Sequence, residues 1–408
     1  GSEIKTKRFE TSLKLGYVFP DLPFQSMGFQ AAYSNHKQDS YFGLRDYNIQ
    51  HQSFYSNLLF SSIIGDTRNK FKTGLSFTYD NYNEFVKTST EQNYDRKENA
   101  IGAFFEYAYD NSDDISITAG VRIDHHNLLG TFITPRLHVR YLPWENGVLR
   151  ASVGRGKRSA NIFAENQQLF ASSREININA TNGNIYGLNP ETAWNFGVSL
   201  SQKYRLSDKK GDVTFDFYQT NFTNQVVVDW ENTQEISFYN LEGKSIANSF
   251  QVEVNQNIAE GFNTRFSYKF YDVFTDYTSG KLAKPLQAKN RFFANVSYET
   301  NSNITSKWKF DLTYNWIGEQ RLPNTTNNPV THQLPSYADS YNLLSGQITK
   351  VFSKKFEVYV GAENITNYKQ KNPILGSENP FGANFDTSIV YAPVFGSNFY
   401  AGLRFKID

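Results

Sequence analysis

The chain has 408 residues, of which 39% are hydrophobic and 16% aromatic, and it carries a formal net charge of +1. No run approaches the ~20 consecutive apolar residues of a membrane helix, which excludes an α-helical membrane protein. Because the net charge is small, the chain has no overall positive field that would attract nucleic acid, and we do not expect nucleic acid as a partner. The lack of cysteine excludes disulfides and thiolate metal sites.

Apolar and polar residues alternate along most of the chain. Such alternation is typical of transmembrane β-barrels, because one face of each strand meets lipid and the other meets a polar lumen. Soluble β-sandwiches alternate too, but these segments are often longer than ordinary strands and carry aromatic residues at the ends of their apolar faces. We therefore predict one all-β domain over residues 1–408, a transmembrane antiparallel β-barrel. Examples of the alternating segments are 8–19, 115–124, 308–316 and 399–408.

The connections between these segments alternate between short and long. The short connections predict periplasmic turns; they are 110–114, 143–147, 207–211, 259–261 and 353–355. The long connections, rich in Asn, Thr and Ser, predict external loops; they are 83–98, 159–192, 227–245, 273–288, 321–339 and 369–396. This pattern gives about 17 strands, whereas an even number would bring both ends to the periplasm. We therefore expect about five further N-terminal strands, which would give a total near 22, as in plugged outer-membrane transporters.

Several motifs resemble those of TonB-dependent outer-membrane receptors. Segments 134–141 and 149–165 resemble the mid-barrel hallmark of the family, and 188–197 follows in the same order. Near the end, 358–368 and 399–405 resemble the strands that frame the last loop of the family. The abundance of Asn, Lys, Tyr and Phe is similar to that of receptors from Bacteroidetes-type bacteria. The resemblance implies a multi-pass protein of the bacterial outer membrane that takes up a scarce nutrient, with energy supplied through TonB.

The resemblance also implies the partners of the protein. Family members carry an N-terminal plug that contacts the TonB complex, and we expect this plug to be missing from the sequence. The implied ligand is a small molecule or glycan, namely a siderophore, cobalamin, metal chelate or oligosaccharide, and the implied surroundings are lipopolysaccharide and outer-membrane lipid. Two other functions stay open: a passive porin, and a structural or adhesion barrel that works with a surface lipoprotein.

Charged residues recur on the predicted lumen face of the strands. Like-signed neighbours in one wall need partners, so we predict that these residues contact the plug or an anionic ligand; ordinary solvated lumen charges are the alternative. The predicted contact residues are Arg122, Arg136, His138, Arg140, Arg150, Arg265 and Lys269. Arg155 and Lys157 continue the lipid face of their strand, where they would meet lipopolysaccharide phosphates or extend to the interface.

The two longest loops contain aromatic residues among polar ones. Aromatic side chains in exposed loops indicate ligand stacking or a partner surface, and packing of loop against loop is the alternative. The predicted substrate-facing residues are Arg158, Phe163, Glu165, Asn166, Arg174, Tyr186, Phe381, Phe385 and Tyr391.

The sequence offers no candidate for catalysis, metal binding or a cofactor. His125 and His126 are adjacent beside Asp124, but neighbouring residues of a strand point to opposite faces and do not readily share one ion. Asp113 and Asp114 lie in a predicted turn, where carboxylate pairs are usually solvated. We therefore predict a protein that is not an enzyme and that needs no cofactor.

Overall fold

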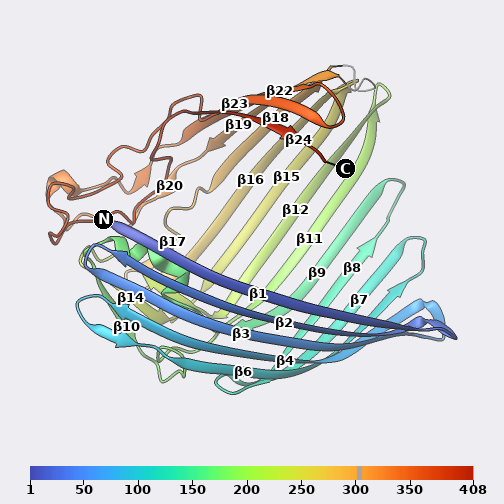
Figure 1. The fold of residues 1–408 in the computed structure, drawn as a ribbon, viewed down its shortest axis with the longest axis horizontal. Coiled ribbons are helices and arrows are strands. Elements are labelled where there is room, and N and C mark those ends of the chain that lie inside the picture. The colour runs from blue at the N-terminus through green and yellow to red at the C-terminus, as the bar shows by residue number, and fades with distance from the viewer. Residues whose placement is uncertain (301–305, 408) are drawn as a thin grey trace.

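The computed structural model describes residues 1–300 and 306–407, and its main feature is one curved sheet of 19 strands (Figure 1). Two of these strands are short, β5 (Glu91–Asn93) and β17 (Gly280–Ala283). The other 17 pair antiparallel in chain order, which confirms the predicted fold. They are β1 (Ser2–Phe19), β2 (Leu22–Phe42), β3 (Arg45–Ile64), β4 (Asp66–Lys87), β6 (Arg96–Asp110), β7 (Ile115–His126), β8 (Gly130–Tyr141), β9 (Gly147–Arg158), β11 (Glu191–Leu206), β12 (Lys209–Asn224), β15 (Ser245–Ala259), β16 (Phe262–Tyr277), β18 (Asn290–Glu299), β19 (Lys307–Ile317), β22 (Tyr341–Val351), β23 (Phe356–Glu363) and β24 (Asn398–Phe405).

The sheet curves into a trough that is open along one side. Within the described residues, β1 pairs only with β2 and β24 pairs only with β23. Figure 1 shows these two edge strands on opposite sides of the opening. No helix in the described part of the chain is long and apolar enough to cross a membrane.

The convex face of the sheet is apolar and uncovered. Leu13 is 52% exposed, Leu75 55% and Val198 48%, and each lies on the outward face of its strand. Exposing so many aliphatic and aromatic side chains to water would be unfavourable in free energy. Contact with the hydrocarbon chains of lipid would avoid this exposure. The opposite face of the same strands carries the polar residues, as the alternation predicted.

Several predicted boundaries are wrong. Of the predicted loop 273–288, the residues up to Tyr277 belong to β16, and Gly280–Ala283 form β17, which pairs with β16. The first strand begins at Ser2 rather than at residue 8, and most of the predicted loop 83–98 is strand, because β4 continues to Lys87 and β6 begins at Arg96. The extension follows from packing: the lumen side of these strand ends is covered by external loops, so Val86 is only 3% exposed. A polar sequence there does not indicate a free loop.

The external loops are themselves folded. Segments 159–190 and 225–244 carry η1 (Ala164–Ala171), β10 (Glu175–Asn179), β13 (Val226–Asp229) and β14 (Glu235–Asn240), and β10 pairs parallel with β14. We call these two segments lobe A. Segments 318–340 and 364–397, here called lobe B, carry β20 (Gln320–Arg321), η2 (Val330–His332) and β21 (Tyr337–Ala338).

Candidate functional site: the concave wall and its external lobes

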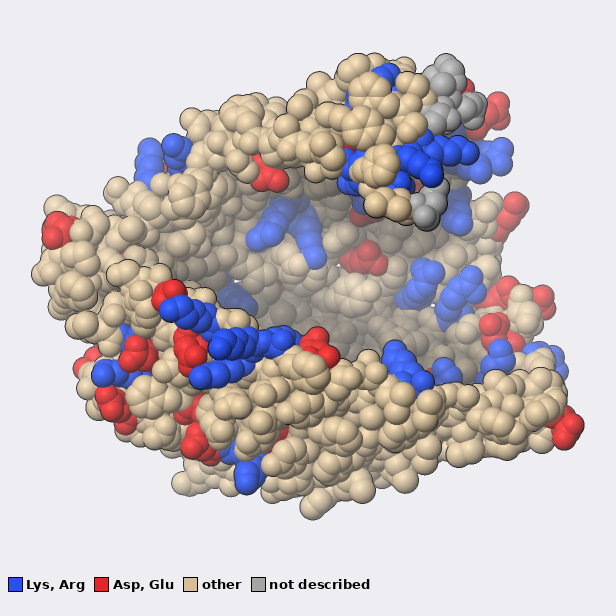
Figure 2. Space-filling model, viewed as in Figure 1, with Lys and Arg blue, Asp and Glu red and all other residues tan. Residues whose placement is uncertain are grey.

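The concave face of the trough carries many cationic side chains, and Figure 2 shows Lys and Arg gathered in the hollow. Three of the predicted lumen residues find partners within the wall itself. Arg122 donates from Nε to Asp124 Oδ2 at 2.8 Å, and Arg136 forms an ion pair with Glu106. Arg265 donates from Nε to Asn255 Oδ1 at 2.8 Å. These three cations are therefore satisfied without a plug, and their contact with one stays a prediction.

The remaining predicted cations on the neighbouring strands are arranged differently. Arg140 of β8 and Arg150 of β9 are directly opposed in the register, and His138 is opposed to Ser152 two register positions away, on the same face. Directly opposed residues of antiparallel strands share one face of the sheet, and like charges in such positions are destabilising. This part of the wall is thus a cationic surface suited to an anionic partner.

A cavity of about 520 Å³ lies on the concave wall against lobe B. Its lining includes Lys269 of β16 and Arg291 of β18, which are opposed in the register, together with the aromatic residues Phe293 and Tyr391. Among the residues that the structure describes, no Asp or Glu lines this cavity. Two cations beside aromatic rings form a site for an anionic group.

The cavity brings together residues that the sequence placed in separate roles. Lys269 was predicted as a lumen contact and Tyr391 as a loop residue facing substrate, and both line this one site. The backbone carbonyl of Tyr391 accepts a hydrogen bond from Gln320 Nε2 within lobe B at 2.9 Å and one from the hydroxyl of Tyr341, the first residue of β22, at 3.1 Å. A single hydrogen bond to the wall therefore accompanies the placement of this carbonyl beside the cavity. Arg291 was missed, although its alternation with Phe292 places it on the polar face.

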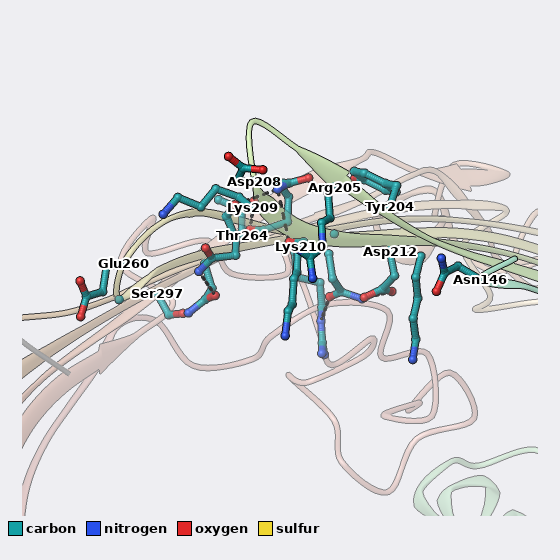
Figure 3. A pocket seen from close by; sticks show the side chains of 18 of the residues that line it. Asn146, Tyr204, Arg205, Asp208, Lys209, Lys210, Asp212, Glu260, Thr264 and Ser297 are labelled. Atoms are coloured by element: carbon teal, nitrogen blue, oxygen red, sulfur yellow. Dashed lines mark hydrogen bonds between the residues drawn. The ribbon is translucent and has the colours of Figure 1, made fainter. Parts of the chain in front are cut away.

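A second, larger cavity of about 1470 Å³ lies at the end of the trough that carries the short turns. Figure 3 shows Arg205, Lys209 and Lys210 of the β11–β12 hairpin around it, with Glu260 of the next hairpin at its edge. Arg265 also lines this cavity. Its mixed charges suit a protein surface better than a small anion.

Lobe A is held on the barrel wall by a buried polar network centred on Arg96. The guanidinium forms ion pairs with Glu84 at 2.7 Å and with Glu98 at 2.9 Å, and it lies 3.8 Å from the centroid of the Tyr82 ring. From the loop side, the Tyr186 hydroxyl donates to Glu84. Each charge in the network therefore has a counter-charge, as buried ions require.

This network shifts the pKa values of Glu98 and Tyr186. It lies at the external end of the wall, beyond the apolar outward-facing residues of β6, the first of which is Ile101. Burial raises the pKa of Glu98, but hydrogen bonds from His126 and Arg96 outweigh this effect and hold the pKa below its usual value. Burial, reinforced by the charge of Glu84, raises the pKa of the Tyr186 hydroxyl. Glu98 is thus held ionised and Tyr186 neutral, the states that their contacts need.

Most predicted substrate-facing residues of segment 159–190 are used inside lobe A. Phe163 is 2% exposed and packs against Tyr47 and Phe170 in an aromatic cluster. Glu165 forms an ion pair with Arg158 at 2.9 Å. These contacts match the alternative of loop packing, and a direct role in binding substrate stays a prediction.

The other predicted loop residues differ in exposure. Asn166 donates from Nδ2 to the Ile162 carbonyl at 2.8 Å, and Arg174 is only 2% exposed. Phe385 is half-buried, whereas Phe381 is 72% exposed. Phe381 is therefore the most accessible of the predicted aromatic residues.

The structure separates the adjacent histidines. The Nε2 atom of His126 lies 3.4 Å from Glu98 on the lumen side, whereas His125 faces outward and contacts Thr131. Within residues 1–300 and 306–407, no group of three or more His, Cys, Asp or Glu side chains is placed to hold a metal ion.

The curved antiparallel wall, with an apolar outer face and a charged inner face, defines the class of transmembrane β-barrels. The family model described as TonB dependent receptor-like, beta-barrel matches residues 3–365. The chain belongs to this family, in agreement with the motifs in its sequence.

Known proteins of this fold are similar to the chain at low sequence identity. The Ferrienterobactin receptor of Escherichia coli (strain K12) is 21% identical over 305 residues, which cover 69% of this chain and 38% of that protein. Among solved structures, the ferric-catecholate import receptor Fiu from K12 E. coli has a TM-score of 0.69 at 11% identity, covering 98% of this chain and 64% of that chain. The copper transporter OprC has a TM-score of 0.72 at 12% identity, covering 98% and 66%. The chain thus spans less than two thirds of the length of each of these proteins.

Proposed function

We propose that the chain forms the barrel wall of an outer-membrane active transporter that takes up a scarce anionic nutrient with energy supplied through TonB. The observation that carries the ligand class is the cavity beside lobe B, where Lys269 and Arg291 meet aromatic rings with no acidic lining residue. Of the ligands expected for the family, a ferric siderophore with anionic oxygen ligands suits this charge better than a neutral oligosaccharide. The names of the relatives, a ferrienterobactin receptor and a ferric-catecholate import receptor, support this choice.

We further propose that an N-terminal segment of the natural protein supplies a plug and the strands that close the sheet between β1 and β24. The unpaired edges of both strands support this proposal, because an uncovered strand edge leaves backbone N–H and C=O groups without partners in the membrane. In such a barrel, the opposed Arg140 and Arg150 would meet carboxylates of the plug. Arg155 and Lys157 would contact lipopolysaccharide phosphates at the outer interface.

Uptake by the full-length natural protein tests this function. Cells that lack their other iron receptors would express the full-length protein and receive ferric enterobactin labelled with radioactive iron. We expect accumulation that stops when the proton gradient is collapsed or when TonB is deleted. The K269Q/R291Q double variant should bind and accumulate less label, while reaching the outer membrane in the same amount.

The alternatives give different results. A passive porin would conduct ions in a planar bilayer and would pass small solutes whether or not the proton gradient is present. A structural or adhesion barrel would show neither uptake nor conductance, and would be recovered in a stable complex with a surface lipoprotein. Either result would overturn the proposed function.

A further inference from the structure

The external loops have two separate hydrophobic cores. The core of lobe A joins residues such as Phe170 and Phe238 to Tyr47 of the wall. The core of lobe B is smaller and is built from Leu322, Ala338, Leu375 and Ile389. Within the described residues, only the half-buried Leu286 packs against both. Each lobe can therefore keep its own core if the two lobes separate.

A buried ion pair joins the lobes at one point. Arg174 of lobe A lies with Nη2 3.0 Å from Oδ2 of Asp386 in lobe B, and the two side chains are 2% and 6% exposed. Backbone hydrogen bonds flank this pair, from Ser173 N to the Phe385 carbonyl at 2.8 Å and from Thr387 N to the Ala171 carbonyl at 2.9 Å. Arg174 also donates from Nη1 to the Trp230 carbonyl at 2.6 Å, which ties both segments of lobe A to this point.

A second buried ion pair joins the lobes with the charges reversed. Glu231 of lobe A accepts from Arg321 of lobe B at 2.7 Å, and the side chains are 8% and 10% exposed. The other oxygen of Glu231 accepts from Asn324 N at 3.1 Å. Both residues of this pair line a cleft of about 750 Å³ between the lobes. The boundary between the lobes, here called the seam, thus consists of polar contacts beside an open cleft.

The anchoring of lobe A to the barrel differs in kind from the seam. Lobe A shares an aromatic core with β3 and β4 and is fixed by the Arg96 network. Separating it from the wall would expose apolar surface, whereas separating lobe A from lobe B would expose mainly charged and backbone groups that water can solvate. Polar boundaries between units with their own cores are where proteins open at low free energy.

We propose that the two lobes form a lid that opens along the seam. The ion pairs Arg174–Asp386 and Glu231–Arg321 hold this lid closed. Opening moves lobe B, which carries Tyr391 over the cationic cavity, away from lobe A, which stays on the wall. The part of this proposal that concerns ligand entry rests on the proposed function. The existence of the seam does not.

Hydrogen exchange of the ligand-free, full-length protein tests the seam directly. The amides of Ser173 and Thr387 report on the seam, and those of Glu175 and Gln370 report on the interiors of lobes A and B, where they donate to Gln234 and Pro393 carbonyls. We expect the seam amides to exchange faster than the interior ones. The double variant D386N/E231Q should accelerate the seam amides at least about tenfold, because it removes both counter-charges, and should leave the interior amides unchanged.

Two results would overturn the proposal. If seam and interior amides exchange at one common rate, the loops open as a single unit. If the double variant leaves the seam amides unchanged, the ion pairs do not hold the lid closed. Neither result depends on which ligand, if any, the protein transports.

A disulfide across the seam tests whether the lid must open for uptake. Ser172 and Asp386 form an antiparallel bridge, and directly opposed positions of this kind lie within the range that a disulfide spans. Residues 1–408 contain no cysteine, so within them S172C/D386C can form only the link across the seam. The matched control is E175C/E235C, which links opposed positions inside lobe A.

We expect the seam disulfide to lower uptake of ferric enterobactin at least about tenfold, with recovery on reduction, while the control transports normally. Equal uptake by the oxidised seam variant and the control would show that the lid need not open. Absence of uptake by the unmodified protein would instead count against the proposed function, and the exchange experiment would still decide on the seam.

Discussion

Lys269 of β16 and Arg291 of β18 are directly opposed in the barrel wall, and both line the cavity against lobe B. Opposed like charges cost about 0.2–1 kcal/mol in a sheet, so the ligand-free wall is less stable than it would be with a neutral residue at either position. We expect R291Q to raise the thermal stability of the ligand-free protein slightly and to weaken the binding of ferric enterobactin about tenfold. Calorimetric unfolding and a binding titration measure the two effects. K14Q, which changes a lumen-facing cation outside this cavity, should alter neither, and unchanged affinity in R291Q would contradict the cationic site.

Phe163 and Phe381 were both predicted to face substrate, yet they are 2% and 72% exposed. Truncating a buried Phe costs about 3–5 kcal/mol, so F163A should loosen lobe A while leaving the barrel folded. F381A should change the free energy of unfolding by no more than about 0.5 kcal/mol. It should weaken ligand binding if the ring of Phe381 stacks on the ligand. Protease cleavage within residues 159–190, followed by mass spectrometry, separates the two variants. Equal cleavage in both would mean that the aromatic cluster does not hold the lobe.

The attachment of lobe A to the wall should weaken in acid. Hydrogen bonds from His126 and Arg96 hold the pKa of Glu98 below the ordinary value of 4.5. A carboxylate whose pKa is lowered on folding contributes stability that is present above pH 4.5 and is lost as the pH falls through the lower folded value. An environment-sensitive label on a cysteine introduced at the exposed Asn182 would follow this loss below pH 4.5. In the E98Q variant, the signal of the label should depend less on pH. If the pH profile of E98Q equals that of the unmodified protein, Glu98 is not the source of the pH dependence.

Gly74 lies at a close approach of two strands. A Cβ atom at this position would lie 2.2 Å from the Leu58 carbonyl oxygen of β3 and 2.9 Å from the Phe104 ring of β6. The backbone oxygen cannot move aside as a side chain can, so we expect G74A to destabilise the barrel by about 1–3 kcal/mol. Gly16 of β1 is the matched control, because a Cβ there meets nothing within 4 Å. Thermal unfolding in detergent should show a lower midpoint for G74A and an equal or higher one for G16A.

The sequence predicted the barrel wall well because a wall between lipid and a polar lumen imposes a strict period of two on the strands. Leu75 and Ser76 show this rule: the first is 55% exposed on the outer face and the second is 4% exposed on the inner face. The same rule would have identified Arg291, which alternates with Phe292. Local pattern was sufficient wherever the environment on each face of the strand was uniform.

The loops could not be predicted in this way because their structure depends on contacts between distant segments. Arg174 and Asp386 are far apart in the chain, and neither position shows that they meet as a buried pair. Polar composition likewise concealed the core around Phe163, since a few aromatic residues from several loops are enough to form it. The predicted loop 83–98 failed for the same reason, because lobe A covers the strand ends that carry Glu84 and Glu98.

The separate cores of the two lobes bear on how such a receptor can change during evolution. A substitution in lobe B that reshapes the surface around Tyr391 need not disturb the packing of Phe170 in lobe A or the register of the strands below. Ligand specificity can therefore diverge in one lobe at a time while the membrane-spanning scaffold is inherited unchanged. Within this arrangement, Arg174, Asp386, Glu231 and Arg321 are the positions where a change in one lobe demands a matching change in the other.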